Sequence, residues 1–150
     1  MLRDDLKQAQ ISAMKGGDKA RLAAIRLILA KIKDRDIELR TASHKPEDDA
    51  MVVETLQKMA KQRRESITMY VDGNREELAE QERKELKVIE EFLPRQMSED
   101  ETRAAIADVK STLNADSIKD MGRVMAELKA RHAAVLDMQT ASRLVKEALS

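Results

Sequence analysis

The chain has 150 residues, enough for one ordinary domain or for two small ones, and its 28 basic and 28 acidic side chains cancel to a net charge of zero. Charged residues make up 37% of it, whereas aromatic residues are one Tyr and one Phe, and this composition favours amphipathic helices over strands. The absence of Cys excludes disulfides, thiolate metal sites and a thiol nucleophile, and the zero net charge excludes a bulk polycation, so a nucleic-acid site has to be a local patch.

Apolar residues recur with a helical period in four segments of the first 93 residues, which predicts an N-terminal antiparallel helical bundle. The expected helices cover residues 2–15, 18–40, 47–71 and 75–92, with turns at Gly16-Gly17, at residues 41–46 and at Asp72-Gly73-Asn74. Asp18 is expected to cap the second helix. The last two helices are expected to pack as a hairpin.

Two positive surfaces are expected in this bundle. The outer face of the second helix carries Arg21, Arg26, Lys31, Lys33 and Arg35, which could contact phosphates but are also typical of a solvated face. The densest cluster is Lys58, Lys61, Arg63 and Arg64, with no acidic residue between Gln57 and Arg64. It could follow a nucleic-acid backbone, or Glu54, Glu65 and the Glu-rich next helix could neutralise it.

Pro94 predicts the boundary between two modules, because proline lacks an N–H and keeps the residue before it out of the helical region. Ser98 and Glu101 have the spacing of a capping box, which predicts a new helix. We therefore expect a helical bundle at residues 1–93, a hinge at 94–97 and a small three-helix tail module at 98–150.

The tail is expected to contain a helix ending near Asn114, a second helix capped by Ser117 and Asp120, a connector at residues 129–136 and a last helix capped by Asp137. Gly122 is unusual in the second of these helices, since glycine costs about 1 kcal/mol there relative to alanine. Either a neighbouring backbone packs against it, or a ligand approaches there.

The chain has no recognisable catalytic or phosphate-cradling motif, and its scarce aromatic residues argue against single-strand recognition by base stacking. No segment reaches the roughly 20 apolar residues of a membrane span, and no apolar secretion signal follows Met1. From these features we expect a cytoplasmic protein that binds no membrane, metal or cofactor.

Two motifs carry a resemblance to a known family. They are the segment Ile89-Glu90-Glu91-Phe92-Leu93-Pro94-Arg95-Gln96-Met97-Ser98 and the segment Ser117-Ile118-Lys119-Asp120-Met121-Gly122-Arg123-Val124-Met125, with Arg143-Leu144-Val145-Lys146 near the end. The chain thus resembles the GatB/YqeY family over its whole length, and its layout is similar to the stand-alone YqeY-like members. The family commonly has a Gly-rich basic loop before the last helix, whereas residues 129–137 here contain no Gly.

The resemblance implies a tail similar to the one with which the tRNA-dependent amidotransferase holds tRNA. The family label includes carbon-nitrogen ligase activity with glutamine as amido-N-donor, but the resemblance brings no complete active site. We therefore expect no catalysis by the chain alone, and any amidotransferase role to be accessory to a catalytic partner such as an amidotransferase or a synthetase.

The leading hypothesis from the sequence is an accessory tRNA-binding protein. The residues expected to contact RNA are Lys119, Gly122, Arg123, Lys129 and Arg131 in the tail, extended by Lys58, Lys61, Arg63 and Arg64. The alternative is a protein-interaction adaptor that docks a partner through Met-rich apolar edges without RNA, and an enzyme comes third. The oligomeric state is left open.

Overall fold

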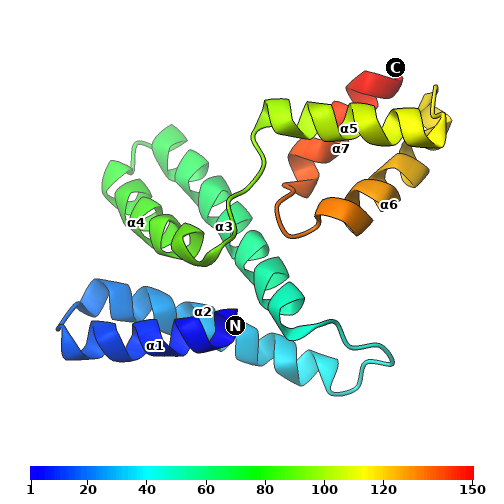
Figure 1. Cartoon of the computed structure of the whole chain (residues 1–150). Coiled ribbons are helices and arrows are strands. Elements are labelled where there is room, and N and C mark those ends of the chain that lie inside the picture. Colours follow the sequence, from blue (N-terminus) through cyan, green and yellow to red (C-terminus); the bar gives the residue numbers. More distant parts are fainter. The chain divides into compact units, whose positions relative to one another are not determined.

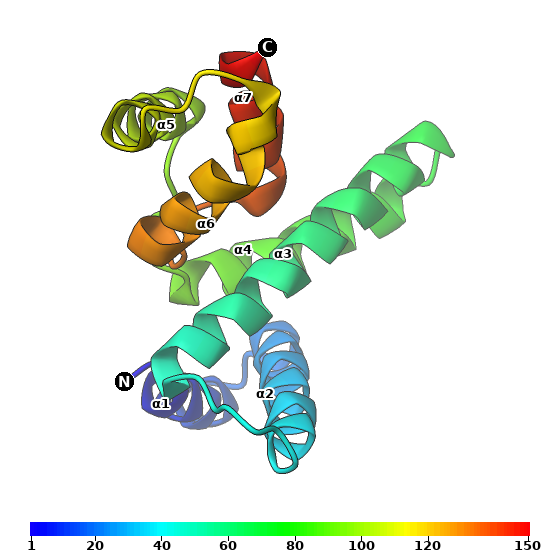
Figure 2. The ribbon, with the colours of Figure 1, turned by 90° about the vertical axis from the view of Figure 1, so that its right-hand side faces the viewer.

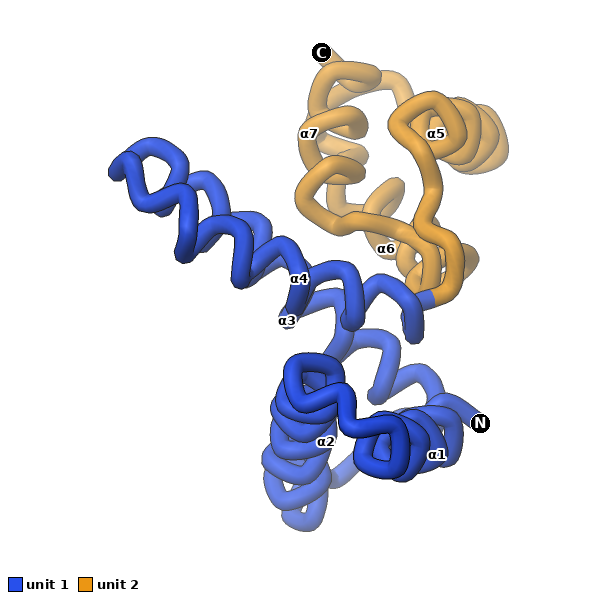
Figure 3. The backbone as a smooth tube through the Cα atoms, turned by 90° about the vertical axis from the view of Figure 1, so that its left-hand side faces the viewer, with its two compact units in different colours: residues 1–93 blue, residues 94–150 orange.

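The computed structural model describes residues 1–150 and is entirely helical, which confirms the expected all-α class (Figure 1). The elements are α1 (Leu2–Lys15), α2 (Lys19–Leu39), α3 (Asp48–Asp72), α4 (Glu76–Phe92), α5 (Glu99–Leu113), the 3-10 turn η1 (Ile118–Asp120), α6 (Met121–His132) and α7 (Met138–Leu149). The chain divides into two compact units, Met1–Leu93 and Pro94–Ser150 (Figure 3). None of the helices has the length and apolar character that crossing a bilayer requires.

In the first unit, α1 and α2 lie side by side in antiparallel directions, and α3 and α4 form a long hairpin (Figures 1 and 2). The core gathers around the first half of α3, whose last buried residue is Ala60. Its buried members are Leu6, Ile28, Ile32, Met51, Val52, Leu56, Met59, Ala60 and Ile89. The far half of the α3–α4 hairpin extends beyond α1 and α2 as a two-helix arm (Figure 2).

Arg3 joins three helices of this unit. Its guanidinium donates to Asp36 of α2 at 2.8 and 2.9 Å and to Asp48 of α3 at 2.7 and 3.2 Å. The hydrogen bonds from Arg3 hold the pKa of Asp36 below its ordinary value. The N–H of Leu2 donates to Asp49 at 3.1 Å, so the first turn of α3 also caps the start of α1.

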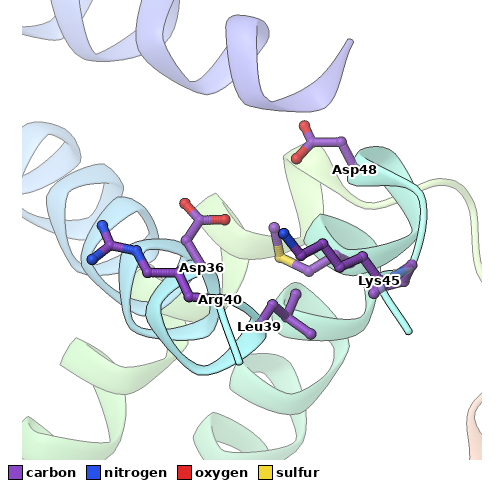
Figure 4. A pocket seen from close by; sticks show the side chains of 7 residues that line it. Asp36, Leu39, Arg40, Lys45 and Asp48 are labelled. Carbon is purple, nitrogen blue, oxygen red and sulfur yellow. The ribbon is translucent and has the colours of Figure 1, made fainter. Parts of the chain in front are cut away.

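A shallow pocket of about 220 Å³ lies beside this junction, between the end of α2 and the start of α3 (Figure 4). Its lining residues are Asp36, Leu39, Arg40, Lys45, Pro46, Asp48 and Met51. Arg40 and Lys45 bring cations to a rim that already holds two carboxylates. Because both carboxylates are bonded to Arg3, the pocket is part of the helix junction.

In the second unit, α5, α6 and α7 pack around one apolar core. Its buried members are Ile106, Val109, Ala115, Val124, Leu128, Leu136, Ala141, Leu144, Val145 and Leu149. The predicted capping box at the start of α5 is formed, with Ser98 and Glu101 exchanging hydrogen bonds of 3.0 and 3.1 Å. Hydrogen bonds, first from Arg95 and then from Ser98, lower the pKa of Glu101 to about 2.

The segment expected to be a hinge is attached to the second unit. Leu93 follows α4 in an extended conformation, with ψ of 142°. The N–H of Met97 then donates to the carbonyl of Val135 at 2.7 Å, and Gln96 Nε2 donates to the carbonyl of Ala134 at 3.0 Å. Residues 96 and 97 are therefore not a free linker.

Two local predictions in the tail are wrong. Ser117 makes no capping hydrogen bond, because a 3-10 turn separates it from α6, and the carboxylate of Asp120 instead accepts from the N–H of Asp116 at 3.1 Å. Residues 129–132 belong to α6, not to a connector. Lys, Ala and Arg are strong helix formers, and no Gly interrupts them before α6 ends at His132.

Candidate nucleic-acid interface

The surface expected to bind RNA is carried by η1 and α6. Val124 and Leu128 are buried in the core of the second unit, so the opposite side of α6 faces outward. The residues exposed on that side are Gly122, Arg123, Ala126, Lys129 and Ala130, and Lys119 is exposed just before them on η1. We call these six residues the α6 face.

Some of the cations at this surface form ion pairs with carboxylates, and others do not. Lys119 and Lys129 are exposed and have no carboxylate within ion-pair distance. Arg123 is paired with Asp120 at 2.8 Å, and this hydrogen bond lowers the pKa of Asp120. Arg131 lies outside the α6 face and is paired with Glu127 at 2.8 Å. Because exposed pairs of this kind are weak, both arginines can exchange their partner for a phosphate.

Gly122 lies on open surface. A Cβ placed there would meet no heavy atom of a neighbour within 4 Å, which excludes a packed backbone, the first of the two alternatives considered for this glycine. Ala126 and Ala130 follow at intervals of four residues and are also exposed. Residues four apart share a helix face, so the cations lie beside a strip of small residues. A ligand backbone can come close to the helix there, because no long side chain covers it.

The cluster on α3 does not form one patch, because successive residues of a helix point 100° apart. Lys58 and Lys61 are exposed, and Lys58 Nζ lies 3.1 Å from Glu54. Arg64 is exposed as well, with a long contact of 3.8 Å to Glu90 of α4.

Arg63 points to the other side of α3, where it takes part in the packing of α3 against α4. Its Nε lies 2.8 Å from Glu85 Oε2 and 3.3 Å from Glu82 Oε2, and about a fifth of each of the three side chains is exposed. The Nε–H is not aligned with either oxygen, so the contact is an ion pair and not a directed hydrogen bond. Arg63 is thus committed to the hairpin and is not available to a ligand.

The basic face of α2 contains both paired and unpaired cations. Arg21 pairs with Glu91 and lies over the ring of Phe92, and Arg35 pairs with Glu38. Arg26, Lys31 and Lys33 have no such partner. The sequence of α2 alone does not show which of these cations are paired, because the partner of Arg21 lies on another helix.

The fold and this surface define a class: an all-α protein of two small units that presents unpaired cations on exposed helices. The family model described as "Yqey-like protein" matches residues 3–149, and the chain belongs to this family. The resemblance inferred from the two motifs is thereby confirmed.

The chain is also similar to fungal proteins named "Altered inheritance of mitochondria protein 41, mitochondrial". The relative from Vanderwaltozyma polyspora is 34% identical over 92 residues, which cover 61% of this chain and 46% of the relative. The relative from Kluyveromyces lactis is 32% identical over 91 residues, covering 61% and 45%. The relative from Saccharomyces cerevisiae strain YJM789 is 29% identical over 93 residues, covering 62% and 46%. The aligned part of the chain spans less than half the length of these relatives.

These relatives contradict the expected cytoplasmic localisation, since their names place them in mitochondria. The expectation rested on the missing Cys and on the missing apolar signal after Met1. Both features suit any reducing aqueous compartment, so they could not single out the cytoplasm.

Proposed function

We propose that this protein is an accessory RNA-binding protein that holds a folded RNA of the tRNA class on the α6 face. The observation that carries the proposal is Gly122, an exposed helical glycine that no neighbour explains and that lies between two unpaired cations, Lys119 and Lys129. Membership of the YqeY-like family, which includes the tail domain of the amidotransferase B subunit, supports it. Any amidotransferase chemistry belongs to a catalytic partner.

The chemistry of the α6 face suits a phosphate backbone. Lysine ammonium groups bind phosphate oxygens as compact point charges, and the low strip of Gly122, Ala126 and Ala130 lets that backbone approach the helix. The face carries no aromatic side chain on which an unpaired base could stack. Recognition then depends on the shape of a folded RNA and on its phosphates.

The first test is tRNA binding by the full chain over a range of salt concentrations. We expect the double variant Lys119→Gln, Lys129→Gln to bind more weakly than the parent at every salt concentration. The slope of log K against log salt should fall by about 1.5, because each phosphate contact contributes roughly 0.7–0.9. Lys146→Gln on α7 is the control for loss of a single exposed charge. Salt-insensitive binding by the parent, or no binding at low salt, would refute the proposal.

Gly122→Ala provides a second test, in which stability and binding should move in opposite directions. The free energy of unfolding should rise by about 0.5–1 kcal/mol, because alanine is the better helix former and its Cβ meets nothing in the free protein. Affinity for tRNA should fall severalfold if the RNA backbone lies against the glycine. Denaturant unfolding and the same tRNA titration measure both. A higher free energy of unfolding with unchanged affinity for tRNA would show that Gly122 is not part of the binding site.

A further inference from the structure

Four cations form a row along α2. Lys19, Arg26 and Lys33 follow at intervals of seven residues, and Arg40, at the C-cap of α2, continues the interval. Seven residues are within 20° of two full turns, so the four share one face, with about 10.5 Å between neighbours and about 31 Å from end to end. All four side chains are exposed. We call them the α2 row.

The carboxylates of α2 leave this row free. Asp36 is bonded to Arg3, and Glu38 accepts from Arg35 at 2.9 Å. Asp34 is the remaining acid of the second half of α2, and it points about 100° round the helix from Lys33. No member of the α2 row has a carboxylate within ion-pair distance, although Arg40 still acts electrostatically on Asp36. Four positive charges on a line therefore lack a partner within their own unit.

We infer that the α2 row binds the phosphate backbone of a double-helical segment of RNA. A line of charges about 31 Å long matches a linear polyanion, and one turn of a nucleic-acid duplex has a similar length, about 34 Å for B-DNA. A single anionic group would engage only one of these cations. The line also has no aromatic side chain for stacking, which disfavours an unpaired strand.

An acidic protein helix fits the row less well. Protein interfaces are anchored by apolar or aromatic side chains at their centre. The exposed apolar residues of α2 are Leu27 and Ile37, and Leu27 points about 100° away from Arg26. Between the cations of the row the surface carries the small side chains of Ala23 and Ala30, and exposed Ile37 lies between Lys33 and Arg40 at one end. One apolar side chain at the end of the row is not a central anchor, so these observations favour a partner that is recognised mainly by charge.

The inference extends the proposed RNA binding to a second surface on the first unit, and the experiment separates the two. The full chain is titrated with unfractionated tRNA and with an RNA duplex of about 20 base pairs, long enough to span the 31 Å row. The test variant carries Lys19→Gln, Arg26→Gln and Lys33→Gln. The matched control carries Lys15→Gln, Lys84→Gln and Lys87→Gln, which removes the same charge from exposed positions of α1 and α4. Glutamine is nearly as good a helix former as lysine or arginine, and circular dichroism verifies the fold of each.

We expect the α2 variant to lose at least tenfold in affinity for both RNAs near 0.1 M salt, with a salt slope lower by about two, and the matched control to change less than twofold. Unchanged binding by the α2 variant would overturn the inference, and so would equal losses in both variants, because total charge would then be sufficient. Competition by poly-L-glutamate as strong as by the RNA duplex would also overturn it, in favour of an acidic protein partner.

The outcomes also separate this inference from the proposed function. If Lys119→Gln, Lys129→Gln abolishes binding and the α2 variant does not, the α6 face remains and the inference fails. If only the α2 variant loses binding, the inference holds and the α6 proposal fails. Losses in both variants, with an intact control, support two surfaces.

Discussion

Arg3 is a residue whose role depends on its position in three dimensions. It is 33 residues from Asp36 and 45 from Asp48, yet its guanidinium bonds both carboxylates, and only 26% of its side chain is exposed. The two carboxylates are 37% and 41% exposed, so water screens each ion pair and each contributes at most about 1 kcal/mol. The bonds of Arg3 connect α1 to both α2 and α3.

We predict that Arg3→Ala lowers the free energy of unfolding by about 1 kcal/mol at pH 7. The effect depends on pH, because Arg3 lowers the pKa of Asp36 below its ordinary value of 3.8. A lowered carboxyl pKa stabilises the fold above that ordinary value, and the contribution disappears as the pH falls through the folded pKa. Urea unfolding of parent and variant should therefore give a smaller difference at pH 3 than at pH 7. A difference that grows on acidification would contradict this role.

Local residue roles were predictable where the partner is close in the sequence. Asp18 and Asp137 cap α2 and α7 as expected, and Asn114 adopts the left-handed conformation that ends α5. Each of these helix caps involves residues no more than four positions apart, so the local sequence is enough to predict it. The bonds of Arg3 involve residues of other helices, and no local pattern indicates them.

At the scale of elements, the α3–α4 hairpin shows why a cluster in the sequence differs from a patch on the surface. Arg63 and Arg64 are neighbours in the chain but point to different sides of α3. Arg63 lies between two α4 carboxylates, with 19% of its side chain exposed, whereas Arg64 is 48% exposed and reaches only to 3.8 Å from Glu90. One arginine therefore supports the hairpin and the other remains a surface charge.

This difference predicts unequal effects of the two alanine substitutions. Arg63→Ala should destabilise the protein by roughly 1–3 kcal/mol, because it leaves Glu82 and Glu85 together without their cation. Arg64→Ala should change stability by less than about 0.5 kcal/mol, as is usual for an exposed pair. Thermal unfolding of both variants measures the difference, and Lys61→Ala controls for loss of an exposed positive charge. Equal effects of the two substitutions would argue against a structural role for Arg63.

The helical spacing of apolar residues predicted where helices occur more accurately than where each helix ends. The expected second helix of the tail stopped near Leu128, where the apolar stripe ends, whereas α6 continues to His132. An apolar stripe indicates only which helical residues are buried, so it does not show a final helical turn whose residues are mostly exposed. The error matters for the site, since Lys129 is thereby held on the same rigid helix as Gly122.

At the scale of the whole molecule, the all-α class follows from the composition and the helical periods alone. The family follows from motifs that span both units. Which cations of α2 and α3 are free could not be predicted, because Arg21 and Arg63 pair with carboxylates of another helix. The pairing of the α6 cations is local, because Arg123 and Arg131 have their carboxylate partners within four positions, whereas on α2 and α3 pairing between helices decides which cations are free.

The attachment of residues 96 and 97 to the second unit gives a prediction about its boundary. A fragment of residues 94–150 should melt several degrees higher than one of residues 98–150, because the shorter fragment lacks the bonds to the carbonyls of Ala134 and Val135. A fragment of residues 95–150 keeps both bonds and should resemble the longer one. Circular dichroism on heating provides the comparison, and identical melting temperatures would show that these bonds add no stability.

If the α2 row and the α6 face both bind RNA as proposed, their place in one chain also affects how long the RNA stays bound. The α2 row belongs to the unit Met1–Leu93 and the α6 face to the unit Pro94–Ser150, and the two units are consecutive in one chain. Where the geometry of an RNA allows both surfaces to engage, its capture by one raises its effective concentration at the other to the order of millimolar. Two contacts that are each weak then give a long residence time, because the RNA leaves only when both release it together.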